Sequence, residues 1–187
     1  MKRIFAVVVI LLTLNVSSKA QQVLKVGDTL DSLRLRNVDG SYFSLTDRNK
    51  SGFILVFMTP SCDHCLAYVD RVIELNKVYA LKGYSVVAIG PYGDNEKDYP
   101  FDAMPAMKKL ATDRGFTFPY LADEKFKYTW LFDIRQTPKA VVLKRTGKGF
   151  EVKYIGNIDN QPDEKSVATR KYVEEEVNKL LLNRSNR

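Results

Sequence analysis

Residues 52–65 read GFILVFMTPSCDHC, and this stretch decides the fold. Its first part, Gly52 to Met58, is a continuous apolar run of strand length, which predicts a strand buried on both faces. After Cys65, apolar residues recur at three-and-four spacing as far as Gly83, which predicts a helix and its end. We therefore expect the tetrapeptide CDHC between a central strand and the first turn of a helix.

The chain contains two cysteines and one histidine, and all three lie in this tetrapeptide as Cys62, His64 and Cys65. A structural zinc site needs four ligands, so only a site shared between chains would suit a metal, and we expect none. A purely structural disulfide over so short a loop would restrict the unfolded chain little. We interpret the pair as a redox dithiol, in which one thiolate attacks and the other resolves a mixed disulfide.

The expected place of Cys62 at a helix N-terminus favours its thiolate, because free backbone N–H groups and the positive end of the helix dipole face it. The two intervening side chains act in opposite directions. A protonated or hydrogen-bonding His64 favours the thiolate, whereas the carboxylate of Asp63 disfavours it. The net sign stays open, but the position of His64 inside the dithiol favours an electronic role over that of a bystander.

A buried strand, a CxxC motif at the start of a long helix and a later Thr-Pro opening another apolar strand resemble the thioredoxin superfamily. The resemblance extends over about residues 26–182, and it implies an α/β, thioredoxin-like fold with a central mixed sheet flanked by helices. Some segments resemble the exported redoxin (AhpC/TSA-like) branch, which includes membrane-tethered thiol-disulfide oxidoreductases and peroxiredoxins and adds an N-terminal extension. The segments that carry the resemblance are FILVFMTPSCDHC (53–65), SVVAIG (85–90), QTPKAVVL (136–143), VGD (26–28), DG (39–40) and YIGNID (154–159).

The resemblance implies roles for four residues. Cys62 matches the exposed nucleophile and Cys65 the resolving thiol. Pro138 matches the cis-proline that faces the dithiol, and Thr137 before it offers backbone groups to an extended substrate peptide. An X-Pro bond tolerates the cis form far better than other peptide bonds do, which fits this assignment. No bound cofactor is implied, and the partners are thiol or disulfide proteins that supply or accept electrons.

At the position where classical thioredoxins carry a buried carboxylate, this chain has Val56. The chain departs from the superfamily pattern at this point. Glu74 or Asp70 on the following helix would be substitutes, although each is more simply a solvated charge on the helix surface. The proton relay therefore stays unassigned.

A peroxidase is the main alternative to a disulfide exchanger. Thr59-Pro60-Ser61-Cys62 fits the Thr-x-x-Cys half of the peroxiredoxin signature, in which the threonine hydroxyl holds the peroxide over the thiolate. However, Leu55 stands where peroxiredoxins have a proline, and Arg135 is not clearly the arginine that stabilises the departing oxygen. We favour disulfide exchange, and a non-catalytic binding module on the same scaffold is a third alternative.

Residues 1–20 have the layout of a secretory signal peptide, with Lys2 and Arg3 before an apolar run and small residues near Ala20. The apolar run of eleven residues is too short to span a bilayer, although a retained membrane anchor is the alternative. We expect a single domain over 21–187, exported to a periplasmic or extracellular space, without stable membrane insertion.

The formal net charge of +7 falls to +4 once the three basic residues of this segment are removed, since it holds no acidic residue. The remaining basic residues are scattered among acidic ones, which argues against binding to nucleic acid. The sequence sets neither the direction of electron flow nor the oligomeric state.

The remaining segments predict further elements. We expect a surface loop at 91–100, a helix over 104–115, and a hairpin turning at 146–149 at one edge of the sheet. A C-terminal helix is expected from Asp163. Several aromatic residues are expected in the core, namely Phe116, Phe118, Phe126, Trp130 and Phe132.

Overall fold

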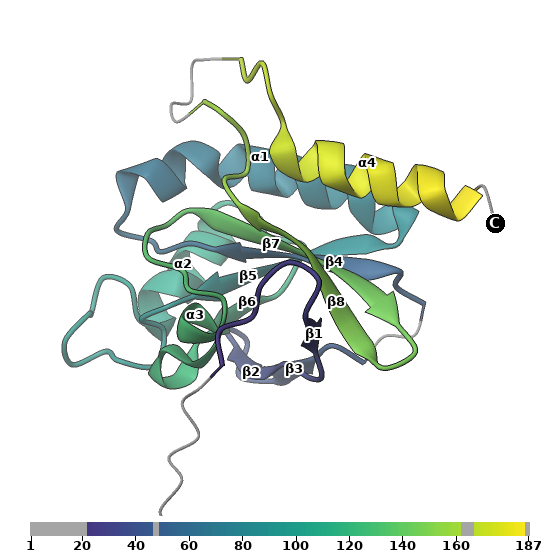
Figure 1. Cartoon of the computed structure of the whole chain (residues 1–187). Helices are drawn as coiled ribbons and strands as arrows, with labels where there is room; N and C mark the ends of the chain where they lie inside the picture. Colours follow the sequence, from purple (N-terminus) through teal and green to yellow (C-terminus); the bar gives the residue numbers. More distant parts are fainter. Residues whose placement is uncertain (1–21, 47–48, 162–166, 186–187) are drawn as a thin grey trace, which may run out of the picture.

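The computed structural model describes residues 22–46, 49–161 and 167–185. The expected signal peptide, residues 1–20, lies outside the described residues. The chain builds one eight-stranded sheet in the order β1-β8-β7-β4-β5-β6-β2-β3 (Figure 1). The strands are β1 (Thr29–Leu30), β2 (Arg34–Asn37), β3 (Tyr42–Ser44), β4 (Gly52–Phe57), β5 (Tyr84–Gly90), β6 (Tyr120–Ala122), β7 (Lys139–Thr146) and β8 (Gly149–Gly156). The helices are α1 (Asp63–Tyr79), α2 (Met104–Asp113), α3 (Lys127–Leu131) and α4 (Tyr172–Ser185), with short 3₁₀ turns η1 (Ala80–Lys82) and η2 (Glu124–Phe126).

Strand β4 lies in the middle of the sheet, as its apolar run predicts. It pairs in parallel with β5 and antiparallel with β7, so the sheet is mixed. All six of its residues are buried, and their side chains alternate between two cores. Ile54 and Val56 enter one core, while Phe53, Leu55 and Phe57 enter the other. The mixed α/β fold expected from the sequence is confirmed.

Helices α1 and α4 lie side by side over one face of the sheet (Figure 1). Their buried residues, among them Val69 and Val177, share a core with Ile54. Helix α1 ends at Tyr79 and continues as the 3₁₀ turn η1 to Lys82. There Gly83 adopts φ +91°, a left-handed conformation that favours glycine, and it ends the helical segment at the residue that the sequence predicts.

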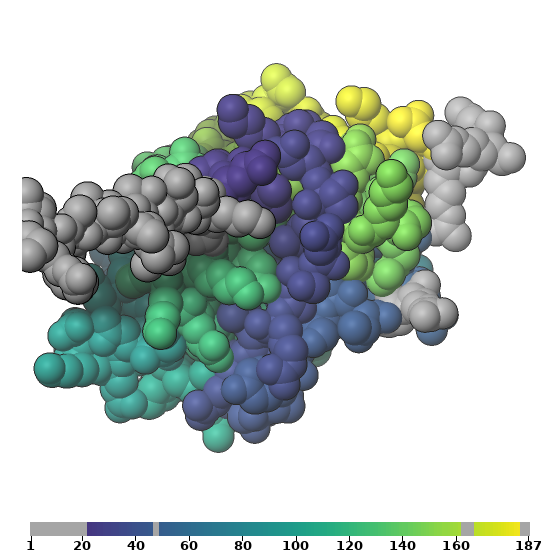
Figure 2. Space-filling model, turned by 60° about the horizontal axis from the view of Figure 1, so that its bottom comes forward, coloured from purple at the N-terminus to yellow at the C-terminus, as the bar shows by residue number. Residues whose placement is uncertain are grey.

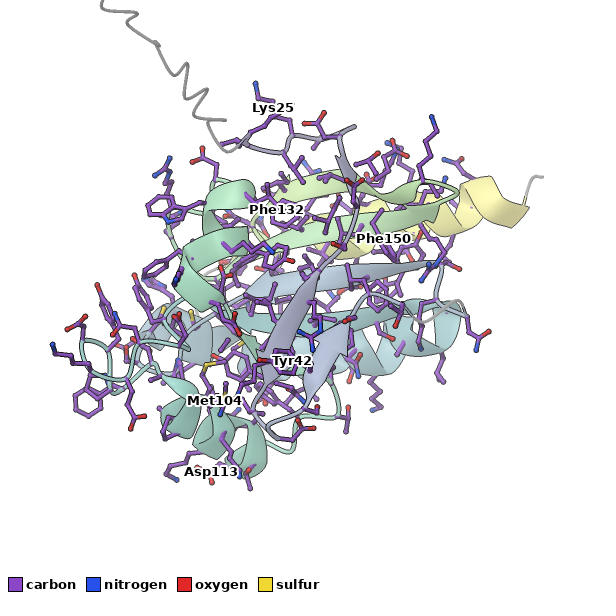
Figure 3. All side chains as sticks on the ribbon, turned by 90° about the horizontal axis from the view of Figure 1, so that it is seen from below. Lys25, Tyr42, Met104, Asp113, Phe132 and Phe150 are labelled. Carbon is purple, nitrogen blue, oxygen red and sulfur yellow. The ribbon has the colours of Figure 1, made fainter. Side chains whose placement is uncertain are left out.

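The opposite face is covered by the N-terminal segment and α3. Viewed from this side, Phe132 and Phe150 lie against the sheet (Figure 3), and both belong to the second core. The segment from residue 22 onward runs across this face next to the β7–β8 hairpin (Figure 2). Both faces of β4 are therefore shielded from solvent, so the strand is a rigid support for Cys62, which follows it in the chain.

Three sequence expectations need correction. In the described part, the C-terminal helix begins at Tyr172, and Val167 is exposed; residues 162–166 of the expected helix lie outside the described residues. Trp130 is 49% exposed instead of buried, because the five-residue α3 turns Tyr128 and Thr129 inward. The hairpin is one strand in from the edge, since β1 pairs with β8 on its outer side.

The neighbours of Gly52 leave no room for a side chain at the start of β4. A Cβ atom at this position would lie 2.1 Å from the Leu143 carbonyl oxygen. We predict that Gly52→Ala lowers the free energy of unfolding by about 3 kcal/mol or more, because neither backbone can move without breaking the sheet.

Urea unfolding followed by circular dichroism measures this effect. The matched control is Gly147→Ala, at a turn where a Cβ atom would meet nothing within 4 Å. That variant is expected to stay within about 0.5 kcal/mol of the wild type. Equal stability of the two variants would contradict the prediction.

Candidate functional site

Cys62 caps the amino end of α1. It has extended backbone angles, and its Sγ accepts the Cys65 backbone N–H at 3.2 Å. Its side chain is half-buried, so solvent and substrates reach the sulfur. The N–H group and the helix dipole both stabilise negative charge at this position. The geometry suits a thiolate that attacks incoming sulfur.

Cys65 has the opposite environment. Its side chain is fully buried, and its Sγ accepts the Thr59 backbone N–H at 3.5 Å. Burial and, to a smaller extent, the neighbouring Cys62 raise the pKa of the Cys65 thiol to about 12. Cys65 therefore keeps its proton at neutral pH, whereas Cys62 is the half-buried sulfur of the pair.

The Thr137–Pro138 peptide faces the dithiol. The bond is cis, as the resemblance implies, and the Thr137 carbonyl oxygen lies 3.7 Å from the Cys62 Sγ. A cavity of about 270 Å³ opens beside this peptide. It is lined by His64, Tyr68, Gln136, Thr137, Pro138, Asn157 and Ile158. The expected residues Cys62, Cys65, Thr59, Thr137 and Pro138 thus meet at one place, with His64 at the rim.

His64 and Thr59 are placed differently from what their expected roles suggest. Within the described residues, His64 is exposed and has no hydrogen bond or ion pair, so its electronic role stays a prediction. Thr59 is almost fully buried and reaches the dithiol through its backbone N–H.

The two carboxylates considered as replacement bases are surface charges. Asp70 has an 83% exposed side chain and pairs with Arg114, while Glu74 pairs with Lys77. The solvated interpretation of both residues is therefore the correct one, and neither faces the cysteines.

A carboxylate that the sequence analysis missed does lie beside the site. Asp102 is only 8% exposed, and it accepts the Ser61 backbone N–H at 2.8 Å and the Ser61 hydroxyl at 2.7 Å. These bonds fix the residue immediately before Cys62. Asp102 stands 41 positions away along the chain, in a segment without a recognisable motif, so no sequence signal pointed to it.

A buried tyrosine completes the surroundings. The Tyr120 hydroxyl donates to the Met58 carbonyl oxygen at 2.9 Å. Burial raises the Tyr120 pKa well above its ordinary value, and the neighbouring Cys65, Asp102 and Cys62 raise it further. The Tyr120 hydroxyl therefore keeps its proton and stays a hydrogen-bond donor to Met58.

The arginine that peroxide chemistry needs is not at the dithiol. Arg135 pairs with Asp133 at 2.5 Å and lies over the Trp130 ring. In the described part of the chain, no arginine is hydrogen-bonded to Cys62.

A search of residues 22–46, 49–161 and 167–185 found no group of three or more His, Cys, Asp and Glu side chains suited to a metal ion. None of the helices described has the length and apolar character that a membrane span requires.

The profile of the Redoxin family matches residues 25–171. The chain therefore belongs to the Redoxin family, and its fold is thioredoxin-like. A search of curated proteins found no match.

Solved structures share this fold. An uncharacterized conserved protein from Geobacillus kaustophilus is 26% identical, with a TM-score of 0.74 over 85% of this chain and 83% of that chain. A putative thiol:disulfide interchange protein DsbE from Chlorobium tepidum is 20% identical, with a TM-score of 0.64 over 84% and 99%. The pneumococcal exposed lipoprotein thioredoxin from Streptococcus pneumoniae is 17% identical, with a TM-score of 0.56 over 81% and 98%.

The unequal burial of the two sulfurs predicts selective alkylation. In the reduced protein at pH 8, iodoacetamide is expected to modify Cys62 and to spare Cys65, whose raised pKa leaves almost no thiolate. Mass spectrometry of peptides checks this. A Cys62→Ser variant is expected to react at least about 100-fold more slowly than the wild type, because only the buried Cys65 thiol remains. Equal modification of both thiols would contradict it.

The bonds from Asp102 predict a positioning role. Asp102→Ala is expected to slow disulfide exchange about tenfold, because Ser61 loses both partners and the adjacent sulfur loses its fixed position. Asp102→Asn is expected to retain most of the rate, since an amide accepts the N–H and donates to the hydroxyl. Asp98→Ala, which alters an exposed carboxylate of the same loop, serves as control. Identical rates in the alanine and asparagine variants would contradict the prediction.

Proposed function

We propose that the chain is an exported thiol-disulfide oxidoreductase that acts through Cys62 and Cys65. The observation that carries this proposal is the asymmetry of the dithiol. Cys62 is half-buried and accepts an N–H bond at a helix N-terminus, whereas Cys65 is buried behind it with a pKa of about 12. An attacking sulfur and a resolving sulfur need these two environments.

In the reducing direction, the Cys62 thiolate attacks one sulfur of a substrate disulfide. A Cys62–substrate bond forms as the substrate S–S bond breaks, and the departing thiolate takes up a proton. Cys65 then loses its proton and attacks the Cys62 sulfur, which forms the Cys62–Cys65 disulfide and releases the second substrate thiol. Two electrons pass from the dithiol to the substrate, and another thiol protein restores them. Oxidation of a substrate dithiol is the same sequence reversed.

The Thr137–Pro138 peptide is the proposed contact for the substrate backbone. The Thr137 carbonyl lies beside the attacking sulfur, and the half-buried Pro138 lines the adjacent cavity. A substrate polypeptide bound along this peptide would place its own sulfur next to Cys62. No bound cofactor takes part, since both electrons are held by sulfur.

Export rests on two observations. Residues 1–20 have the composition of a signal peptide, and one structure with the same fold is described as an exposed lipoprotein thioredoxin. An oxidising compartment supplies the disulfides on which the reaction depends.

Insulin reduction by dithiothreitol, followed by turbidity, tests the proposed activity. The wild-type chain is expected to accelerate it at least about tenfold over dithiothreitol alone, and Cys62→Ser is expected to abolish the acceleration. Peroxide consumption is measured on the same samples. Fast peroxide turnover with negligible insulin reduction would replace the proposal with a peroxidase, and inactivity in both assays would indicate a binding module.

A further inference from the structure

Five aromatic residues lie on the loop after β5 and on the η2–α3 segment, three of them exposed and two half-buried. We call this group, Tyr92, Tyr99, Phe101, Phe126 and Trp130, the aromatic surface. The Tyr92 and Tyr99 rings stack at 4.2 Å, and Phe126 contacts both Tyr92 at 5.4 Å and Trp130 at 6.2 Å, edge to face. Phe101 is 77% exposed, Trp130 49% and Tyr99 40%. Three exposed aromatic side chains on two segments that a hydrogen bond joins are unusual on a protein surface.

The backbone beneath these rings is firmly held in an uncommon conformation. Lys125 and Phe126 have φ values of +54° and +56°, which L-residues rarely adopt. The Lys125 N–H donates to the Asp94 carboxylate at 2.9 Å, which joins the two segments. The fully buried Asp123 accepts both the Tyr128 and Thr129 N–H groups at the start of α3. Such strained positions persist where surrounding contacts enforce them, and they concentrate at functional places.

The aromatic surface adjoins the dithiol on one side through the loop. Phe101 is followed directly by Asp102, whose carboxylate holds Ser61, the residue before Cys62. The Asp102 N–H donates to the Tyr99 carbonyl oxygen, so the tyrosine is part of the same turn. In Figure 1 this loop extends from the body of the molecule beside α3.

A second connection runs from α3 to the Thr137–Pro138 peptide. The Arg135 guanidinium lies 5.1 Å from the centre of the Trp130 ring. Two residues further along the chain, the Thr137 carbonyl oxygen contacts the Cys62 sulfur. On both sides, a residue of the aromatic surface is therefore followed within a few residues along the chain by one that contacts Cys62 or its neighbour Ser61.

We propose that the aromatic surface docks the protein partner that Cys62 attacks, and that it selects polypeptides with exposed apolar side chains next to their disulfide. This inference rests on the proposed function. A mixed disulfide fixes one residue of the partner at Cys62, so the neighbouring residues of the partner cross the adjoining surface. Aromatic and arginine side chains are the types that contribute most to binding between proteins. A small disulfide has no neighbouring polypeptide that could cover these rings.

Kinetics with two substrates of different size provide the first test. The double variant Phe101→Ala/Trp130→Ala is expected to lower kcat/KM for insulin about tenfold, mainly through KM, and to leave the rate with oxidised glutathione within about twofold. Tyr42→Ala is the matched control, because Tyr42 is a 54% exposed aromatic residue with Arg34 over its ring, on the edge strand β3 (Figure 3). Equal losses with both substrates, or no loss with insulin, would overturn the inference.

Fluorescence provides the second test, because Trp130 is the single tryptophan of the chain. In Cys65→Ser, attack by Cys62 leaves a stable mixed disulfide, since no second thiol resolves it. With insulin attached, we expect the Trp130 emission to shift to shorter wavelength and acrylamide quenching to fall about twofold, as in a ring covered by protein. With glutathione attached, neither is expected to change.

The outcomes separate the two proposals. An insulin adduct that leaves Trp130 as quenchable as before would overturn the docking surface and leave the proposed function intact. A free protein that is dimeric by gel filtration, with Trp130 already protected, would assign the surface to a second copy and overturn the inference as well. Failure of Cys65→Ser to form either adduct would instead refute the proposed function.

Discussion

The structure depends on the complete burial of β4. A strand sealed on both faces cannot shift along its neighbours without exposing apolar side chains to water, so its carboxyl end is fixed in space. The chain leaves that end and immediately starts α1, and Cys62 lies at the junction. The Cys62 sulfur thus owes its position to the packing of β4 behind it and to the Asp102 bonds that hold Ser61 beside it.

The difference between the two sulfurs follows from the same junction. One turn of helix separates the cysteines, and within that turn the chain passes from the surface into the core shared by α1 and the sheet. Cys62 therefore faces solvent and the helix N-terminus, while Cys65 faces apolar side chains. The cysteines are only three residues apart, yet burial raises the pKa of Cys65 while Cys62 is half-buried.

Much of this could be predicted from the sequence, because the deciding signals are local. The apolar run of β4, the spacing in α1, Gly83 and the Thr-Pro pair each act over a few residues. Asp102 could not be found in this way, since its partner Ser61 is brought to it only by the folded sheet. Trp130 was misplaced for a related reason. Aromatic residues are usually buried, and the chain gives no local sign that so short a helix presents this ring outward.

The two residues between the cysteines, Asp63 and His64, are exposed and make no contact on which the fold relies. The backbone alone supplies the N–H bond to Cys62 and the helical turn beneath it. Side chains at these two positions can therefore be exchanged with little change in packing. The electronic role predicted for His64 would then vary independently of the scaffold.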